Sequence, residues 1–166
     1  MTHSTTLDPQ QQAILDNIER FGLAVMHVAS EDPRLPSYSY SVGFKHSLSR
    51  PEVLVYGLDQ GLAQSMINEV FRQCQEDGLE LTDGRLVGNL IEGYDCMVRP
   101  IDDPRARTAH LGYATWFERQ RGAEEAVGAV QIVWPDPKTR AYPWQPDCGA
   151  DIRGWQVQLY PAGAPR

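Results

Sequence analysis

The segment Glu52–Gly57, EVLVYG, is the feature that most constrains how this chain can fold. It is short and nearly continuously apolar, which is typical of a strand covered on both faces at the centre of a sheet. Asp59 follows it and predicts the N-cap of a helix from Gln60 to about Glu76. The apolar residues of that helix fall on one stripe: Leu62, Met66, Ile67, Val70, Phe71 and Cys74. We therefore expect this helix to cover one face of the sheet.

Other segments carry the pattern of further strands. The segment Tyr38–Phe44 alternates large residues with Ser39, Ser41 and Gly43, which predicts one core face and one narrow face that another backbone or a ligand can approach. Its core face is expected to hold Tyr38, Tyr40, Val42 and Phe44. Residues 45–51 read as a polar loop. The remaining strands are expected at Leu23–Ala29, about Arg85–Leu90, Tyr94–Ile101, Ala129–Trp134 and, as a last short one, residues 155–159.

Two more helices complete the expected set. Asp8-Pro9 predicts a helix start, with Gly22 as its end, and Thr108–Arg121 reads as a further helix. Five or six strands and about three helices in no strict βαβ order indicate an α+β fold with a mixed or mostly antiparallel sheet. The length of 166 residues suits one domain. We assign residues 1–8 to a flexible lead, 9–160 to the domain and 161–166 to a tail.

The net charge of the chain indicates which classes of partner it can bind. The chain has 15 Lys+Arg and 22 Asp+Glu, a net charge of −7. Such a chain lacks the basic field that non-specific nucleic-acid binding needs, so no nucleic-acid partner is expected. The acidity suits solubility, or a basic protein partner whose field would complement it. The sequence shows neither an apolar signal segment nor a membrane span, so we expect a cytoplasmic protein.

Neither the cysteines nor any catalytic motif indicates a particular chemistry. Cys74, Cys96 and Cys148 are odd in number and lack a C-x-x-C spacing, which argues against a disulfide framework or a zinc knuckle. We expect Cys74 and Cys96 in the core and Cys148 exposed. No complete hydrolase, P-loop or dinucleotide-binding motif is present. Neither a metal nor a cofactor is expected.

The histidines are scattered along the chain. His3 lies in the lead, and His27 lies on a predicted strand, where a core or edge role is the simpler interpretation. His46 follows Lys45 in the predicted loop and is a candidate to face a site. His110 is expected near a helix start, where its positive form would be disfavoured.

Polar residues at strand ends are more informative. Glu52 opens the central apolar strand and Asp136 follows the Gln131–Trp134 segment, so each is either a turn former or a pocket residue. Gln131 lies inside an apolar strand and must find hydrogen-bond partners if it is buried. The late aromatic residues either bind a partner or cover an open face of the sheet: Tyr142, Trp144, Trp155 and Tyr160.

Four blocks of this sequence resemble the bacterial domain of unknown function 4262 family. They are Tyr38–Phe44 (YSYSVGF), Arg50–Leu58 (RPEVLVYGL), Ile67-Asn68 and Gln131–Asp136 (QIVWPD). Ser41 and Phe44 stand where the family tends to have Thr and Leu. The resemblance implies one cytoplasmic bacterial domain, and it carries no established activity. The positions on its motifs are Tyr40, Gly43, Glu52, Asn68, Gln131, Trp134 and Asp136.

Two function hypotheses follow. The first is a non-catalytic, acidic partner-binding protein of the immunity or regulatory type. The alternative is a small enzyme or small-molecule-binding domain whose pocket is formed by Tyr40, Glu52 and Asp136, with Tyr40 as donor and a carboxylate as base. In that alternative, Lys45 and His46 would hold an anionic substrate.

Overall fold

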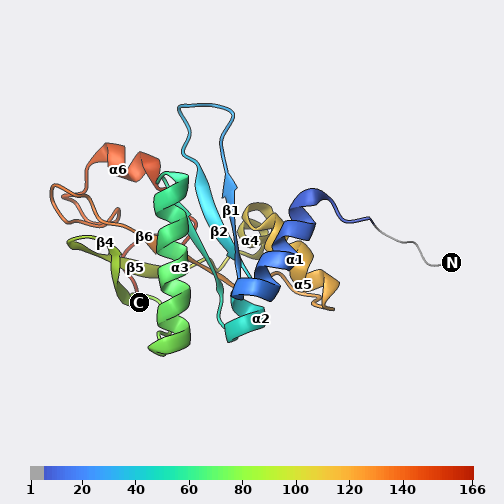
Figure 1. Cartoon of the computed structure of the whole chain (residues 1–166). Coiled ribbons are helices and arrows are strands. Elements are labelled where there is room, and N and C mark those ends of the chain that lie inside the picture. The colour runs from blue at the N-terminus through green and yellow to red at the C-terminus, as the bar shows by residue number, and fades with distance from the viewer. Residues whose placement is uncertain (1–5) are drawn as a thin grey trace.

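One six-stranded mixed sheet organises the molecule, and the α+β class predicted from the sequence is confirmed. The computed structural model describes residues 6–166 (Figure 1), so the expected lead at residues 1–8 lies largely outside the described residues. The strand order is β1-β2-β3-β6-β5-β4. The strands are β1 (Ala24–Val28), β2 (Tyr38–Val42), β3 (Glu52–Tyr56), β4 (Leu86–Ile91), β5 (Tyr94–Pro100) and β6 (Ala129–Val133).

The apolar run that begins at Glu52 forms β3, a central strand whose five residues are all buried. It pairs antiparallel with β2 and parallel with β6, where Glu52 lies opposite Ala129. The other three pairings are antiparallel. The sheet is therefore mixed through a single parallel pair.

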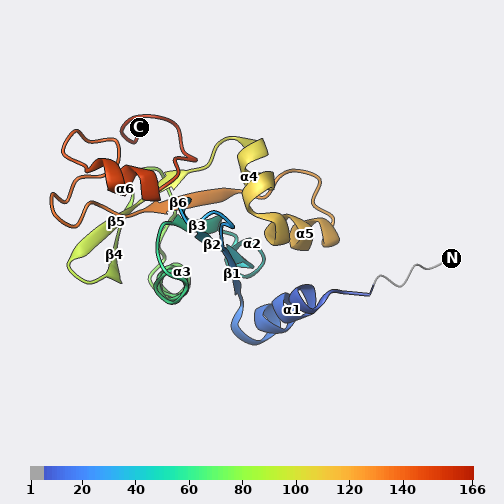
Figure 2. The ribbon, with the colours of Figure 1, turned by 90° about the horizontal axis from the view of Figure 1, so that it is seen from above.

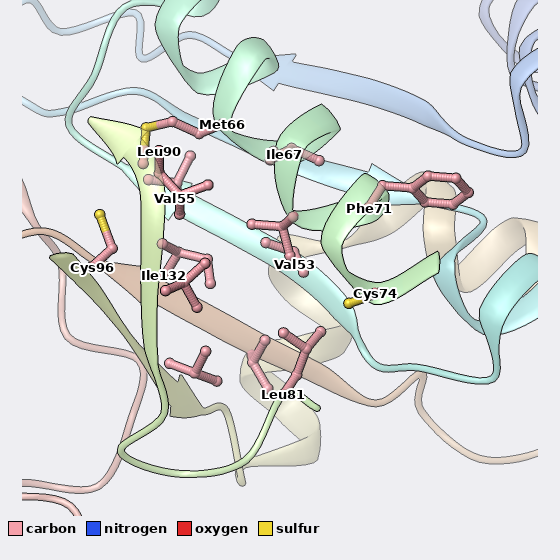
Figure 3. Close-up of a cluster of buried hydrophobic side chains, with 14 of the residues drawn as sticks. Val53, Val55, Met66, Ile67, Phe71, Cys74, Leu81, Leu90, Cys96 and Ile132 are labelled. Atoms are coloured by element: carbon pink, nitrogen blue, oxygen red, sulfur yellow. The ribbon is translucent and has the colours of Figure 1, made fainter. Parts of the chain in front are cut away.

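Helix α3 covers one face of this sheet, as its apolar stripe predicts. It spans Gln60–Glu76, and the Asp59 side chain accepts a hydrogen bond from the Leu62 backbone N–H as its N-cap. Figure 3 shows its buried side chains meeting those of Val53 and Val55 from β3 and Ile132 from β6. The helices of the whole fold are α1 (Pro9–Phe21), α2 (Phe44–Leu48), α3, α4 (Pro104–His110), α5 (Gly112–Gln120) and α6 (Ala150–Trp155).

A second hydrophobic cluster lies on the opposite face of the sheet. Figure 2 shows α1 and α5 on the other side of β1, β2 and β3 from α3. Helices α1 and α5 supply most of its helical side chains, and its strand side chains include Tyr40, Leu54 and Tyr56. The six helices described exceed the expected three, because α2, α4 and α6 are short elements of five to seven residues.

The expected loop over residues 45–51 is in part a helix, which corrects the sequence interpretation. Gly43 has φ +117°, and a Cβ there would lie 2.7 Å from the Gly22 carbonyl oxygen, so the residue type is dictated by close packing. This residue turns the chain out of β2 and into α2. Phe44 consequently packs into the hydrophobic cluster under α3, whereas Tyr40 and Val42 belong to the cluster on the opposite face of the sheet.

The single helix expected over residues 108–121 is two helices. Asp103 accepts a hydrogen bond from the Arg105 N–H as the N-cap of α4, and Pro104 occupies its first position. Leu111, at φ −112° and ψ 55°, breaks the helix before α5 begins at Gly112. His110 therefore lies in the last turn of α4. The sequence interpretation, which placed it near a helix start, is wrong.

The last expected strand, over residues 155–159, does not form. Residues Ala150–Trp155 form α6, and the chain beyond it runs without regular structure. Side-chain amides replace the missing strand ladder, because Gln156 bonds both the N–H and the carbonyl of Trp134. The Gln131 amide bonds the Val157 carbonyl and the Leu159 N–H in the same way. A polar seam thus joins the C-terminal segment to β6.

The expected tail, residues 161–166, lies against β5. The carbonyls of Pro161 and Gly163 accept hydrogen bonds from the Arg99 guanidinium. The Arg166 N–H donates to the Asp83 carboxylate. These contacts continue the seam along the sheet.

Candidate functional site

Glu52 lies in a cradle of hydrogen-bond donors at the N-terminus of α2. Its side chain is fully buried and accepts hydrogen bonds from the Ser41 hydroxyl at 2.7 Å and from the Phe44 N–H at 3.0 Å. The N–H groups of Gly43 and Lys45 lie 3.2 and 3.4 Å from its second oxygen. The carboxyl group therefore closes the turn between β2 and α2.

Burial dominates the electrostatics of this cradle. Desolvation raises the pKa of Glu52 from its ordinary value of 4.5 to about 7, and the donors around it limit the rise. A carboxyl group with such a pKa is a candidate general base. Its oxygens, however, are occupied by Ser41 and the backbone, so the observed arrangement is structural.

Asp136 is also committed to local structure. Its carboxylate accepts hydrogen bonds from the N–H groups of Lys138 and Gly149, both at 2.8 Å. These backbone donors, Gly149 first, hold the pKa of Asp136 below its ordinary value. The side chain organises the loop that follows β6.

The structure does not bring Tyr40, Glu52 and Asp136 to one pocket. Glu52 lies beside the first residue of β6, whereas Asp136 follows the end of that strand. At roughly 3.3 Å per residue, β6 alone puts about 13 Å between those ends. Tyr40 belongs to the second hydrophobic cluster, which α1 and α5 cover, and its hydroxyl accepts a hydrogen bond from the Tyr113 N–H. The three-residue acid–base pocket of the alternative hypothesis is therefore absent among these described residues.

The other candidate residues lie in separate places. Gln131 is buried and hydrogen-bonded, as its burial requires, and Trp134 fills the core while its indole N–H donates to the Tyr56 carbonyl. Asn68 is exposed on α3. Lys45 and His46 are both exposed on α2, where the His46 ring meets the edge of Phe117 and the Lys45 ammonium lies 4.0 Å from Glu118.

A cleft of about 570 Å³ is the clearest candidate binding site. It lies between the β1–β2 hairpin, the first turn of α1 and the α4–α5 corner. We call it the aromatic cleft, and its main lining residues are Met26, Tyr38, Tyr40, His110, Tyr113 and Trp116. Among the described residues that line it there is no Lys, Arg, Asp or Glu. Concave, mostly apolar surfaces with a few fixed polar groups are typical of small-molecule sites.

The polar groups of the aromatic cleft have fixed roles. The His110 Nδ1 lies 2.9 Å from the Ala106 carbonyl oxygen, which can only accept, so Nδ1 carries the hydrogen. In the neutral ring Nε2 is then an acceptor for a ligand N–H or O–H. The Tyr38 hydroxyl donates to the His110 carbonyl, and the two rings lie 5.4 Å apart. Burial raises the pKa of Tyr40 to about 12, so its hydroxyl stays protonated at neutral pH.

The family described as a domain of unknown function, DUF4262, matches residues 17–149 of the 166-residue chain. The chain belongs to the DUF4262 family. No curated protein and no solved structure matches it.

In this DUF4262 chain the motif positions mainly build the framework. Gly43 and Glu52 belong to the turn from β2 into α2, and Gln131, Trp134 and Asp136 hold the C-terminal segment and the loop after β6. Tyr40 is the motif residue that reaches the aromatic cleft. Most motif residues therefore stabilise the fold, and of the motif positions Tyr40 lines the aromatic cleft.

Sequence reasoning missed most of the residues that line the aromatic cleft. One helix was expected over residues 108–121, with His110 near its start, whereas His110 lies in the last turn of α4 and Trp116 lies on α5. Tyr40 was a candidate site residue, but the alternation of Tyr38–Phe44 placed Tyr38 and Tyr40 on the core face and expected a ligand at the opposite face, whereas both tyrosines line the cleft. The other wall depends on the break at Leu111, for which the sequence offers only the following Gly112 as a signal.

The remaining sequence expectations concern thiols, metals and membranes. Cys148 is buried, which corrects the expectation that it is exposed, and burial raises the pKa of all three thiols. Such thiols are poor nucleophiles at neutral pH. Within residues 6–166, no three His, Cys, Asp or Glu side chains gather in a group that fits a metal ion. No helix in that range has the length and apolar character needed to cross a membrane.

Proposed function

We propose that this DUF4262 chain is a non-catalytic binding domain of the bacterial cytoplasm that holds an uncharged, planar small molecule in the aromatic cleft. The observation that carries the proposal is the cleft itself, which combines aromatic walls with the fixed acceptor of His110. The proposal keeps the small-molecule alternative from the sequence and moves its site from Glu52 and Asp136 to the surroundings of Tyr40.

The candidate acid–base residues are already hydrogen-bonded within the fold, which favours binding over catalysis. General acid–base catalysis needs a titrating group within hydrogen-bond reach of the substrate. Glu52 and Asp136 instead accept backbone hydrogen bonds, and the Tyr40 hydroxyl accepts one from Tyr113. No acid–base pair faces the aromatic cleft from these three residues.

The lining of the aromatic cleft defines the ligand class. A charged ligand would lose its hydration there without meeting a Lys, Arg, Asp or Glu, so an uncharged ligand is favoured. Tyr38, Tyr113 and Trp116 line the cleft and are partly exposed, so they present aromatic surfaces on which a planar ring can stack. A ring N–H would complete the site by donating to His110 Nε2.

Indole and naphthalene test this proposal, because they are planar and uncharged but only indole carries an N–H. We expect indole to bind in the aromatic cleft more tightly than naphthalene. Trp116→Ala should weaken indole binding about tenfold, in line with the loss of one aromatic contact of roughly 1.4 kcal/mol. The matched control is Trp155→Ala, since Trp155 is 44% exposed on α6. Amide chemical-shift titration measures both; equal loss in the two variants would contradict the proposal.

The net charge of −7 supports a second candidate function, binding of a basic protein partner. The exposed carboxylates are spread over α1, α3 and several loops. Such a field would speed association at long range, and salt would screen it. We expect the immobilised protein to capture a basic protein from its native lysate at low salt and to release it as ionic strength rises. Capture that is insensitive to salt, or no capture, would count against this candidate.

A further inference from the structure

We infer that the outer edge of β1 binds an extended peptide segment of a basic partner, which adds a further strand to the sheet. β1 is one of the two edge strands, since it pairs with β2 alone. Among residues 6–166, no group outside β2 forms a hydrogen bond with the backbone of β1. The inference rests on the second candidate function, the binding of a basic partner, and gives it a site. It is independent of the aromatic cleft.

The pairing pattern shows which backbone groups of β1 point outward. The carbonyl of Ser37, the residue before β2, accepts a hydrogen bond from the residue after β3. The residues of an antiparallel strand turn alternately to its two neighbours, so Tyr40 turns to β1, where it lies opposite Met26. The N–H and carbonyl groups of Val25 and His27 therefore point away from the sheet. These groups can pair with an added strand.

The opposite edge strand, β4, is closed to such pairing. Its register shifts between Val87 and Ile91, and Asn89 has φ +66°. The Gln73 amide of α3 also donates to the Gly88 carbonyl. Bulges and covering groups are devices by which proteins block edge strands. The register of β1 is regular, and its sequence AVMHV contains neither Lys nor Pro, so its edge is open.

Two adjoining hollows of about 300 and 340 Å³ follow this open edge between α1 and α3 (Figure 2). We call them together the edge groove. Asn17 of α1 lines both hollows, and Gln60, Gln64 and Asn68 line them from α3. All four side chains are exposed, and none has a hydrogen bond among residues 6–166. Amide side chains suit a peptide, because each offers both donors and an acceptor to backbone groups. The motif residue Asn68 thus acquires a role.

Charge decides the kind of peptide. Among the described residues that line the edge groove there is no Lys, Arg, Asp or Glu, so the segment that pairs with β1 is uncharged. The flanking helices with their caps are acidic. Residues 8–21 contain three acidic residues and one Arg, and residues 59–77 contain four and one. Lys or Arg residues on either side of the uncharged segment complement this field.

A second copy of this chain suits the edge less well than a basic peptide. Antiparallel pairing of two β1 strands about a two-fold axis would set α1 beside α1 and α3 beside α3. Helices of like charge would then face one another, which disfavours the dimer. We therefore expect the free chain to be a monomer with an open edge.

The blocked peptide acetyl-KKVTVTVKK-amide tests the inference on the full chain. Saturation with it should slow hydrogen exchange of the Val25 and His27 amides at least tenfold, because they gain a partner, whereas the Met26 amide is already paired with β2. The same peptide N-methylated at its five central residues keeps its charge and loses its donors. It should bind at least tenfold more weakly, as should acetyl-EEVTVTVEE-amide.

Three results would overturn the inference. The first is unchanged exchange of the Val25 and His27 amides at saturation, or no binding of the peptide. The second is equal affinity for the N-methylated peptide, which would mean that charge alone attracts it. The third is a dimer of the free chain, seen by sedimentation, in which both amides already exchange slowly. That result would give the edge to a second copy.

Variants separate the backbone from the amides of the edge groove. Val25→Pro removes an outward N–H and spares the β1–β2 ladder, since proline is tolerated where a strand N–H faces solvent. It should weaken peptide binding about tenfold. The double variant Asn17→Ala with Asn68→Ala should weaken it by a similar factor. The matched control is Gln12→Ala, an exposed amide of α1 that bonds Asp16 and lines neither hollow.

A melting curve for each variant reports folding. If Val25→Pro does not fold, the double variant decides, because alanine is at least as good a helix former as asparagine. Equal peptide binding by the double variant and by Gln12→Ala would contradict the role of the amides. Salt-sensitive capture of a basic protein that survives in a folded Val25→Pro chain would keep the second candidate function and place its partner elsewhere, which overturns this inference alone.

Discussion

Arg99→Leu should lower the free energy of unfolding by about 3–5 kcal/mol, the usual cost of removing one partner from a buried charged network. Arg99 is 1% exposed, although it is charged. Its Nε donates to the Asp83 carboxylate at 2.8 Å, and its two Nη atoms donate to the carbonyls of Gly163 and Pro161. A leucine would leave all three acceptors without this donor.

Aromatic packing adds to the expected loss. The Arg99 guanidinium lies 4.4 Å from the centre of the Trp144 ring and 4.6 Å from that of Tyr160, so it joins two separate parts of the C-terminal segment to β5. Urea unfolding measures the effect. Arg85→Leu is the matched control, because Arg85 is exposed beside the same hairpin and should change stability by less than about 0.5 kcal/mol. Equal stability of the two variants would contradict this role for Arg99.

The role of Arg99 shows why the C-terminal part of the chain resisted prediction. The sequence left open whether the late aromatic residues bind a partner or cover the sheet. Trp144 and Tyr160 lie over Arg99 of β5, whereas Trp155 is exposed. The alternation of residues 155, 157 and 159 nevertheless predicted a strand that does not form. Strand patterns identify residues that pack on a sheet, but Gln131 and Gln156 supply the hydrogen bonds here, and such side-chain pairing has no periodic signal.

The elements with strong local signals were predicted well. Helix α3 begins after its Asp59 cap and ends at Glu76 as expected, and β3 is central because its residues are apolar on both faces. The β2–α2 turn was missed, since the N-terminal donors of a five-residue helix are satisfied by Glu52, eight residues after Phe44 in the sequence. Capping by a distant residue leaves no local pattern. The aromatic cleft depends on a different corner, the break at Leu111, for which the sequence offers only the following Gly112 as a signal.

Glu52 also provides the second large expected effect, a loss of stability as the pH rises. The pKa of Glu52 is about 7 in the folded chain because of burial, against an ordinary value of 4.5. A carboxyl group whose pKa is raised by folding stabilises the fold fully below its unfolded pKa and loses that contribution as the pH rises through the folded pKa. The difference of 2.5 pKa units corresponds to about 3 kcal/mol, lost between about pH 4.5 and 7.

Glu52→Gln isolates this contribution, because the amide has a similar shape and does not titrate. The free-energy difference between the unchanged chain and Glu52→Gln should move by about 2–3 kcal/mol in favour of the variant between pH 5 and 8, because a part of the full effect is already lost at pH 5. The histidines titrate in both proteins, so their effects cancel in the difference. Asp136→Asn is the control with the opposite sign: its pKa is lowered, so its contribution is lost only in acid and its difference should stay flat over this range. Urea unfolding at pH 5, 6, 7 and 8 measures both differences, and a flat difference for Glu52→Gln would show that Glu52 is already ionised at pH 5, held charged by the donors of Ser41 and α2.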